Sequence, residues 1–124
     1  MQKTILIGLA GFVGTVGRYW LSDAIARQHG EAFPWGTVVV NLIGCFLVGC
    51  FYYATEERFA LSPSWRSVIL IGLLGGFTTF SSYGLQTFAL LREGQIVWAS
   101  LNVAISNGVG ILMVWAGYSI TRIL

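Results

Sequence analysis

Four long apolar runs make up most of this chain of 124 residues. A helix needs roughly 20 mostly apolar residues to cross the hydrocarbon layer of a membrane, and each run is close to that length. Only 10% of the residues are charged, whereas about a quarter are charged in a typical soluble domain. We therefore expect an all-α membrane protein, with residues 1–124 forming a single four-helix domain. Its spans should cover about residues 4–26, 37–55, 68–91 and 96–120.

The first run also shares features with a secretory signal peptide. Lys3 precedes the run, and residues 24–26, Ala-Ile-Ala, resemble a small-residue cleavage site. The run is long for a signal peptide, however, and it carries Arg18. Because further apolar runs follow and would anchor the chain anyway, we expect a retained helix.

Lysine and arginine, which favour cytoplasmic loops, give this chain no clear orientation. Four basic residues fall on the side of the two termini, namely Lys3, Arg58, Arg66 and Arg122. Three fall on the opposite side, namely Arg18, Arg27 and Arg92. This balance is either accidental or a sign that the chain inserts in both directions, so that two copies pair antiparallel. The scattered basic residues and the formal charge of +2 predict no nucleic-acid partner.

Polar side chains inside the expected spans must be paired or must border water. Asn41 lies in the second span, and Asn102, Ser106 and Asn107 lie in the fourth. Such groups either clamp neighbouring helices together or line a path through the membrane. The sequence leaves both roles open.

Small residues recur in every span, and glycine alone occurs 16 times. Their expected role is close helix packing, for example at Gly49 in the second span and Gly117 in the fourth. Cys45 and Cys50 lie on the second predicted helix without enough nearby cysteine or histidine ligands for a metal site. We expect both cysteines to act as small apolar packing groups.

The strongest local feature is the stretch 72–84, with the sequence Gly-Leu-Leu-Gly-Gly-Phe-Thr-Thr-Phe-Ser-Ser-Tyr-Gly. Paired glycines followed by hydroxyl residues favour a break in the third span. Broken backbone at membrane depth persists only where it is buried in protein or lines a cavity. A break would free carbonyl oxygens that could bind a cation, and N–H and hydroxyl groups that could meet an anion. The alternative is a kinked helix whose hydroxyls bond its own carbonyls.

Three motifs in the same order resemble the Fluc (CrcB-type) fluoride ion channels of microbes. They are Gly17-Arg18, Gly36-Thr-Val-Val-Val-Asn41 and Gly75-Gly-Phe-Thr-Thr-Phe-Ser-Ser-Tyr83. The resemblance implies a channel that lets fluoride leave the cytoplasm passively. It also implies a dual-topology homodimer with two antiparallel pores and a structural sodium ion at the dimer centre. The expected location is a cell inner membrane, multi-pass and in contact with lipid, in a bacterium.

The resemblance also assigns roles to individual residues. The pore asparagine of the family matches Asn41 and its first pore phenylalanine matches Phe80. Its second pore phenylalanine falls on Tyr83, which keeps an aromatic ring but adds a hydroxyl that can donate a hydrogen bond. Hydroxyls beside the pore would come from Thr79, Ser81 and Ser82. The sodium ion would be held by the carbonyls of Gly75 and Thr78 of both subunits, and Arg18 would lie near the aqueous vestibule.

Two other functions fit a chain of this size. A small multidrug-type proton antiporter would need a titratable acid in its binding chamber, whereas the acidic residues here lie at or near the expected span ends: Asp23, Glu31, Glu56, Glu57 and Glu93. A non-transporting membrane assembly subunit would leave the hydroxyl-rich stretch without a role. We expect no enzyme activity, because the lone histidine, His29, has no nucleophile partner in the sequence pattern.

Overall fold

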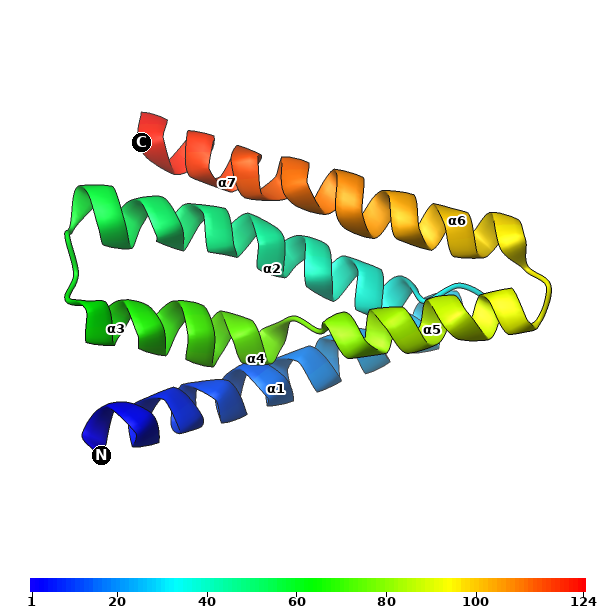
Figure 1. Ribbon diagram of the computed structural model, residues 1–124, viewed down its shortest axis with the longest axis horizontal. Coiled ribbons are helices and arrows are strands. Elements are labelled where there is room, and N and C mark those ends of the chain that lie inside the picture. The colour runs from blue at the N-terminus through cyan, green and yellow to red at the C-terminus, as the bar shows by residue number, and fades with distance from the viewer.

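The computed structural model describes all 124 residues and contains only helices and their connections. Four helical segments are long and apolar enough to cross a membrane, which confirms that prediction. They run antiparallel to their neighbours in sequence, and both termini lie at the same end of the molecule, on the left in Figure 1. The segments are α1 (Gln2–His29); α2 (Trp35–Tyr53) with the π-helical turn η1 (Ala54–Arg58); α3 (Pro63–Ser67), π-helical η2 (Val68–Leu74), α4 (Gly75–Phe77) and α5 (Phe80–Arg92); and α6 (Ile96–Ala104), π-helical η3 (Ile105–Val109) and α7 (Gly110–Ile123).

Short connections with distinct backbone requirements separate these segments. Gly30 follows the last residue of α1 and has a φ of +76°, and the α5–α6 connection passes through Gly94, where φ is +75°. Residues with a Cβ rarely adopt such positive φ values, so glycine suits both positions. Pro63 occupies the first turn of α3, where its missing N–H has no helical partner to lose.

Glycines let the helix backbones approach closely along two pairs of segments. α2 packs along α7, and α1 packs along η2 and α4. A Cβ added at Gly49 would overlap the carbonyl of Val114, and one added at Gly117 would overlap the carbonyl of Phe46. The α2–α7 pair therefore makes a reciprocal small-residue contact, the kind that replaces hydrophobic driving force between helices in lipid.

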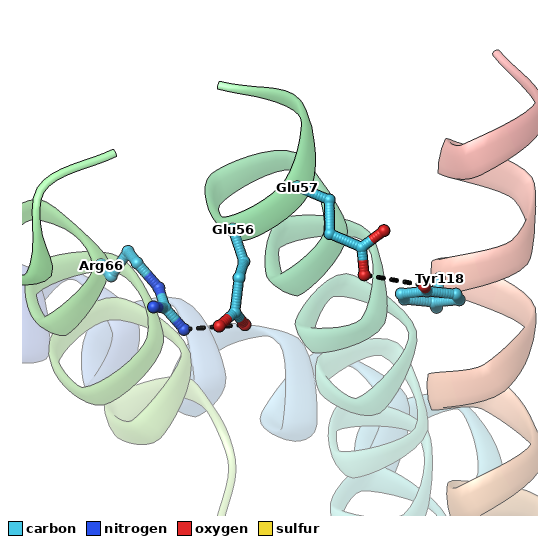
Figure 2. Close-up of polar contacts among 4 residues, drawn as sticks. All are labelled: Glu56, Glu57, Arg66 and Tyr118. Carbon is cyan, nitrogen blue, oxygen red and sulfur yellow. Dashed lines mark hydrogen bonds and ion pairs between the residues drawn. The ribbon is translucent and has the colours of Figure 1, made fainter. Parts of the chain in front are cut away.

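A polar cluster at the end that holds the termini joins three segments (Figure 2). Glu56 and Glu57 follow each other in η1 and point to opposite sides. The Glu56 carboxylate accepts a hydrogen bond from Arg66 Nη2 of α3 at 3.0 Å, and the Glu57 carboxylate accepts one from the Tyr118 hydroxyl of α7 at 2.8 Å. The two carboxylates thus tie the end of the second segment to both neighbours.

The contact between α2 and α7 generates a testable prediction about stability. Gly117→Ala should lower the free energy of unfolding by about 1–3 kcal/mol, because the new methyl group would have to displace the backbone of α2. Gly108→Ala is the matched control on the same span, since a Cβ at position 108 would meet nothing within 4 Å. Thermal unfolding in detergent, followed by circular dichroism, compares the variants. Equal stability of the two variants would contradict the packing described here.

Candidate functional site

The third segment leaves helical geometry near its middle. α4 ends at Phe77, and the next two residues are extended, with φ −92° and ψ 160° at Thr78 and φ −148° and ψ 120° at Thr79. α5 then begins at Phe80. Figure 1 shows this extended stretch as the thin link between α4 and α5. Backbone N–H and C=O groups released at such a depth need other partners, because lipid offers none.

Asn41 of α2 supplies both partners that Thr79 has lost. Its Nδ2 donates to the Thr79 carbonyl at 2.9 Å, and its Oδ1 accepts from the Thr79 N–H at 2.8 Å. The half-buried side chain therefore pairs with one residue of the extended stretch as a neighbouring strand would. The two bonds together also fix which way the amide of Asn41 points.

The side chain of Thr79 starts the helix that follows. Its Oγ1 accepts from the Ser82 N–H at 3.2 Å, as an N-cap residue does, and donates to Ser82 Oγ at 3.0 Å. Ser81 Oγ lies 3.5 Å from the same Thr79 oxygen. The hydroxyls at these positions therefore form one local group around the first turn of α5.

These bonds leave carbonyl oxygens without their usual helical donors. In a continuous helix the Thr79 N–H would bond Gly75, but it bonds Asn41 instead. The Ser82 N–H would likewise bond Thr78, but it bonds the Thr79 hydroxyl. The carbonyls of Gly75 and Thr78 are thus free of these two bonds.

Arg18 reaches the same region from α1. Its Nε donates to the Gly76 carbonyl at 3.2 Å, and Thr15 Oγ1 donates to the same oxygen at 3.4 Å. The guanidinium group therefore lies against the end of α4. The sequence contained the arginine but gave no sign of this particular partner.

A cavity of about 270 Å³ opens beside the extended stretch. Its walls come from α2, the extended stretch, the start of α5, η3 and α7. The lining residues are Asn41, Cys45, Val48, Thr78, Thr79, Phe80, Tyr83, Ser106, Asn107 and Val114. Hydrogen-bond donors and aromatic rings therefore surround a space that contains no acidic or basic side chain.

The cavity brings together most of the residues that the sequence singled out for a pore. Asn41, Thr79, Phe80 and Tyr83 line it, whereas Ser81 and Ser82 lie outside its lining. The Phe80 and Tyr83 rings are neighbours, with centroids 5.4 Å apart, and Phe80 remains 81% exposed. Sequence patterns missed Cys45, because an isolated small residue on an apolar helix gives no sign that it borders a cavity.

The polar residues of the fourth segment divide into two roles. Asn102 is only 1% exposed and donates to Thr87 Oγ1 of α5 at 2.8 Å, so it clamps two helices together. Asn107 lines the cavity and donates to the Tyr83 hydroxyl at 2.9 Å. Ser106 takes part in both, since it lines the cavity and also donates to Asn102 Oδ1 at 3.4 Å.

A larger cavity of about 490 Å³ lies at the opposite end of the molecule from the termini. It is formed by the end of α1, the connection to α2 and the end of α5, and Asp23, Glu31 and Glu93 are among its lining residues. Its position at the helix ends places these acids outside the middle of the spans. The 270 Å³ cavity, by contrast, lies beside the middle of the third segment and is lined by several side chains that can donate hydrogen bonds.

Comparison with known proteins agrees with this geometry. Residues 5–118 match the family described as CrcB-like protein, Camphor Resistance (CrcB). Three similar proteins are each named fluoride-specific ion channel FluC: one of Rhodospirillum rubrum (40% identical, covering 92% of this chain and 90% of the relative), one of Methylocella silvestris (46%, covering 92% and 87%) and one of Allorhizobium ampelinum (42%, covering 98% of both). The resemblance drawn from the three motifs is thereby confirmed, and this chain belongs to the CrcB-like protein family.

Proposed function

We propose that the protein is a fluoride-selective channel that lets fluoride leave the cytoplasm passively and so lowers its toxicity. The observation that carries this proposal is the similarity, over nearly the whole chain, to proteins named fluoride-specific ion channels. The chemistry of the 270 Å³ cavity supports it independently.

Fluoride is a small and strongly hydrated anion, so a pore must replace its lost water with hydrogen-bond donors. Among the lining residues, Tyr83 keeps its hydroxyl hydrogen free, and Asn41 Nδ2 keeps a second hydrogen besides the one that it donates to the Thr79 carbonyl. The edge of the Phe80 ring carries partial positive charge and can face an anion without offering a site to cations. Because no fixed positive charge lines the cavity, an anion that binds there can also leave, as conduction requires.

The alternative function, a small multidrug-type proton-coupled antiporter, has less support. It needs an acid that takes up and releases protons in the binding chamber, and no acidic side chain lines this cavity. Glu56 and Glu57 are engaged with Arg66 and Tyr118 at one end of the helices (Figure 2).

We propose further that two copies pair antiparallel as a homodimer. A single chain leaves Phe80 81% exposed and buries only 16 of its 124 residues. A second copy would cover the open side of the 270 Å³ cavity, and the nearly balanced flanking charges allow insertion in both directions.

We place the protein in the inner membrane of a bacterium, because bacterial outer-membrane proteins span as β-barrels whereas this chain is helical.

A structural sodium ion at the dimer centre is also part of this proposal. The carbonyls of Gly75 and Thr78 fit such an ion, because the N–H groups that would bond them in a continuous helix bond Asn41 and the Thr79 hydroxyl instead. Hard cations prefer oxygen ligands of this kind. Loss of dimer on gel filtration after sodium is exchanged for a large organic cation would support the site, whereas an unchanged dimer would count against it.

Fluoride efflux from liposomes tests the function directly. Liposomes that hold the purified protein and fluoride should release fluoride once valinomycin lets potassium balance the charge, and chloride-loaded liposomes should not release chloride. A channel needs no proton gradient, whereas an antiporter does, and an assembly subunit should behave like empty liposomes.

The role of Phe80 gives a sharper prediction. Phe80→Met keeps most of the apolar volume but removes the positive ring edge, so fluoride efflux should fall by at least about tenfold, the rate change expected for a barrier raised by 1.4 kcal/mol. Phe88→Met, on the same helix and outside the cavity lining, is the matched control and should conduct normally. Gel filtration checks that both variants assemble. Near-normal efflux through Phe80→Met would remove this ring from the path.

Dual topology can be tested without any transport assay. A tag on the N-terminus should react with a membrane-impermeant label from both sides of the membrane in one preparation, because the flanking charges nearly balance. A variant with lysines added between Glu56 and Trp65 is the control, and it should label mainly from one side. Labelling of the unmodified chain from one side alone would contradict the antiparallel arrangement.

A further inference from the structure

Asn107 makes two hydrogen bonds with a single nitrogen atom. Its Nδ2 donates to the Val103 carbonyl of its own segment at 2.9 Å and to the Tyr83 hydroxyl oxygen at 2.9 Å. A side-chain amide nitrogen carries two hydrogens, so both are engaged. Because a carbonyl can only accept, the bond to Val103 fixes the amide with its nitrogen toward Tyr83. Asn107 therefore acts on Tyr83 as a donor.

This arrangement determines what the Tyr83 hydroxyl can do. Its oxygen already accepts a hydrogen from Asn107, and its own hydrogen bonds no acceptor of the chain. Tyr83 lines the cavity beside Phe80, with ring centroids 5.4 Å apart. The O–H group therefore remains available to donate to whatever occupies the cavity.

We infer that Asn107 is a positioning residue that holds the Tyr83 hydroxyl as a donor to the anion in the cavity, and so increases the affinity of the path for fluoride. The inference rests on the proposed channel function. A hydrogen bond to an anion is about twice as strong as one between neutral groups, and fluoride is the halide that accepts hydrogen bonds most strongly. A phenylalanine at position 83 would offer only its ring edge.

A purely structural role for this pair is the competing explanation. Asn107 is exposed, whereas Asn102, five positions earlier on the same segment, is 1% exposed and already joins the segment to Thr87 of α5. The helix–helix clamp is therefore supplied elsewhere. An exposed bond between Asn107 and Tyr83 adds little to stability but decides the orientation of a group in the cavity.

The test measures fluoride efflux from liposomes as a function of fluoride concentration for Tyr83→Phe, Asn107→Leu and the double variant. Each single variant should retain efflux but raise the half-saturating fluoride concentration by about tenfold, equivalent to 1.4 kcal/mol. Because Asn107 acts through the Tyr83 hydroxyl, the double variant should show no further increase. Asn107→Ala provides a second variant that adds no bulk.

Tyr118→Phe is the matched control, because it removes a tyrosine hydroxyl that bonds Glu57 at the end of the helices and lies outside the cavity lining. It should leave the half-saturating concentration unchanged. Gel filtration and thermal unfolding check assembly of every variant. If the unmodified protein conducts fluoride but the Asn107 variants match it, or if the two single effects add in the double variant, the inference is overturned alone. Absence of efflux from the unmodified protein would overturn the proposed function and this inference with it.

Discussion

The structure depends on satisfying backbone polar groups in the middle of an apolar span. Thr78 and Thr79 leave helical geometry where lipid offers no hydrogen-bond partner. Asn41 meets this requirement by bonding both the N–H and the carbonyl of Thr79. A backbone group left without a hydrogen-bond partner at this depth would cost several kcal/mol. The extended stretch is therefore stable because the amide of Asn41 in α2 lies beside Thr79.

Several features of the site follow from that pair of bonds. With its N–H committed to Asn41, Thr79 caps α5 through its hydroxyl, and α5 restarts with Phe80 and Tyr83 on neighbouring parts of one face. The bond from the Thr79 N–H to Asn41 leaves the Gly75 carbonyl without its helical donor, and the bond from the Ser82 N–H to the Thr79 hydroxyl does the same for the Thr78 carbonyl. One requirement of the backbone therefore positions both the aromatic residues of the proposed fluoride path and the carbonyl oxygens proposed as sodium ligands.

The sequence predicted the helices better than the contacts. The length and apolarity of each run determine whether it can span, so the four spans were predictable from the residues themselves. The partner of a polar side chain depends instead on how two helices are rotated and shifted against each other. The bond between Asn41 and Thr79 joins residues 38 apart, and that between Arg18 and Gly76 joins residues 58 apart. A local sequence pattern cannot show contacts between residues so far apart in the chain. It could not show either that Cys45 borders a cavity whose other walls come from later segments.

A native cysteine allows the most direct test of where the path lies. Cys45 lines the cavity and Cys50 does not. Fluoride efflux should be measured before and after treatment with methyl methanethiosulfonate, with modification of each thiol followed by intact mass. The account predicts that modification of Cys45 blocks efflux, that Cys45→Ala conducts and resists the block, and that Cys50→Ala is blocked like the unmodified protein. Full efflux through a protein whose Cys45 is completely modified would contradict the placement of the fluoride path beside Asn41 and Phe80.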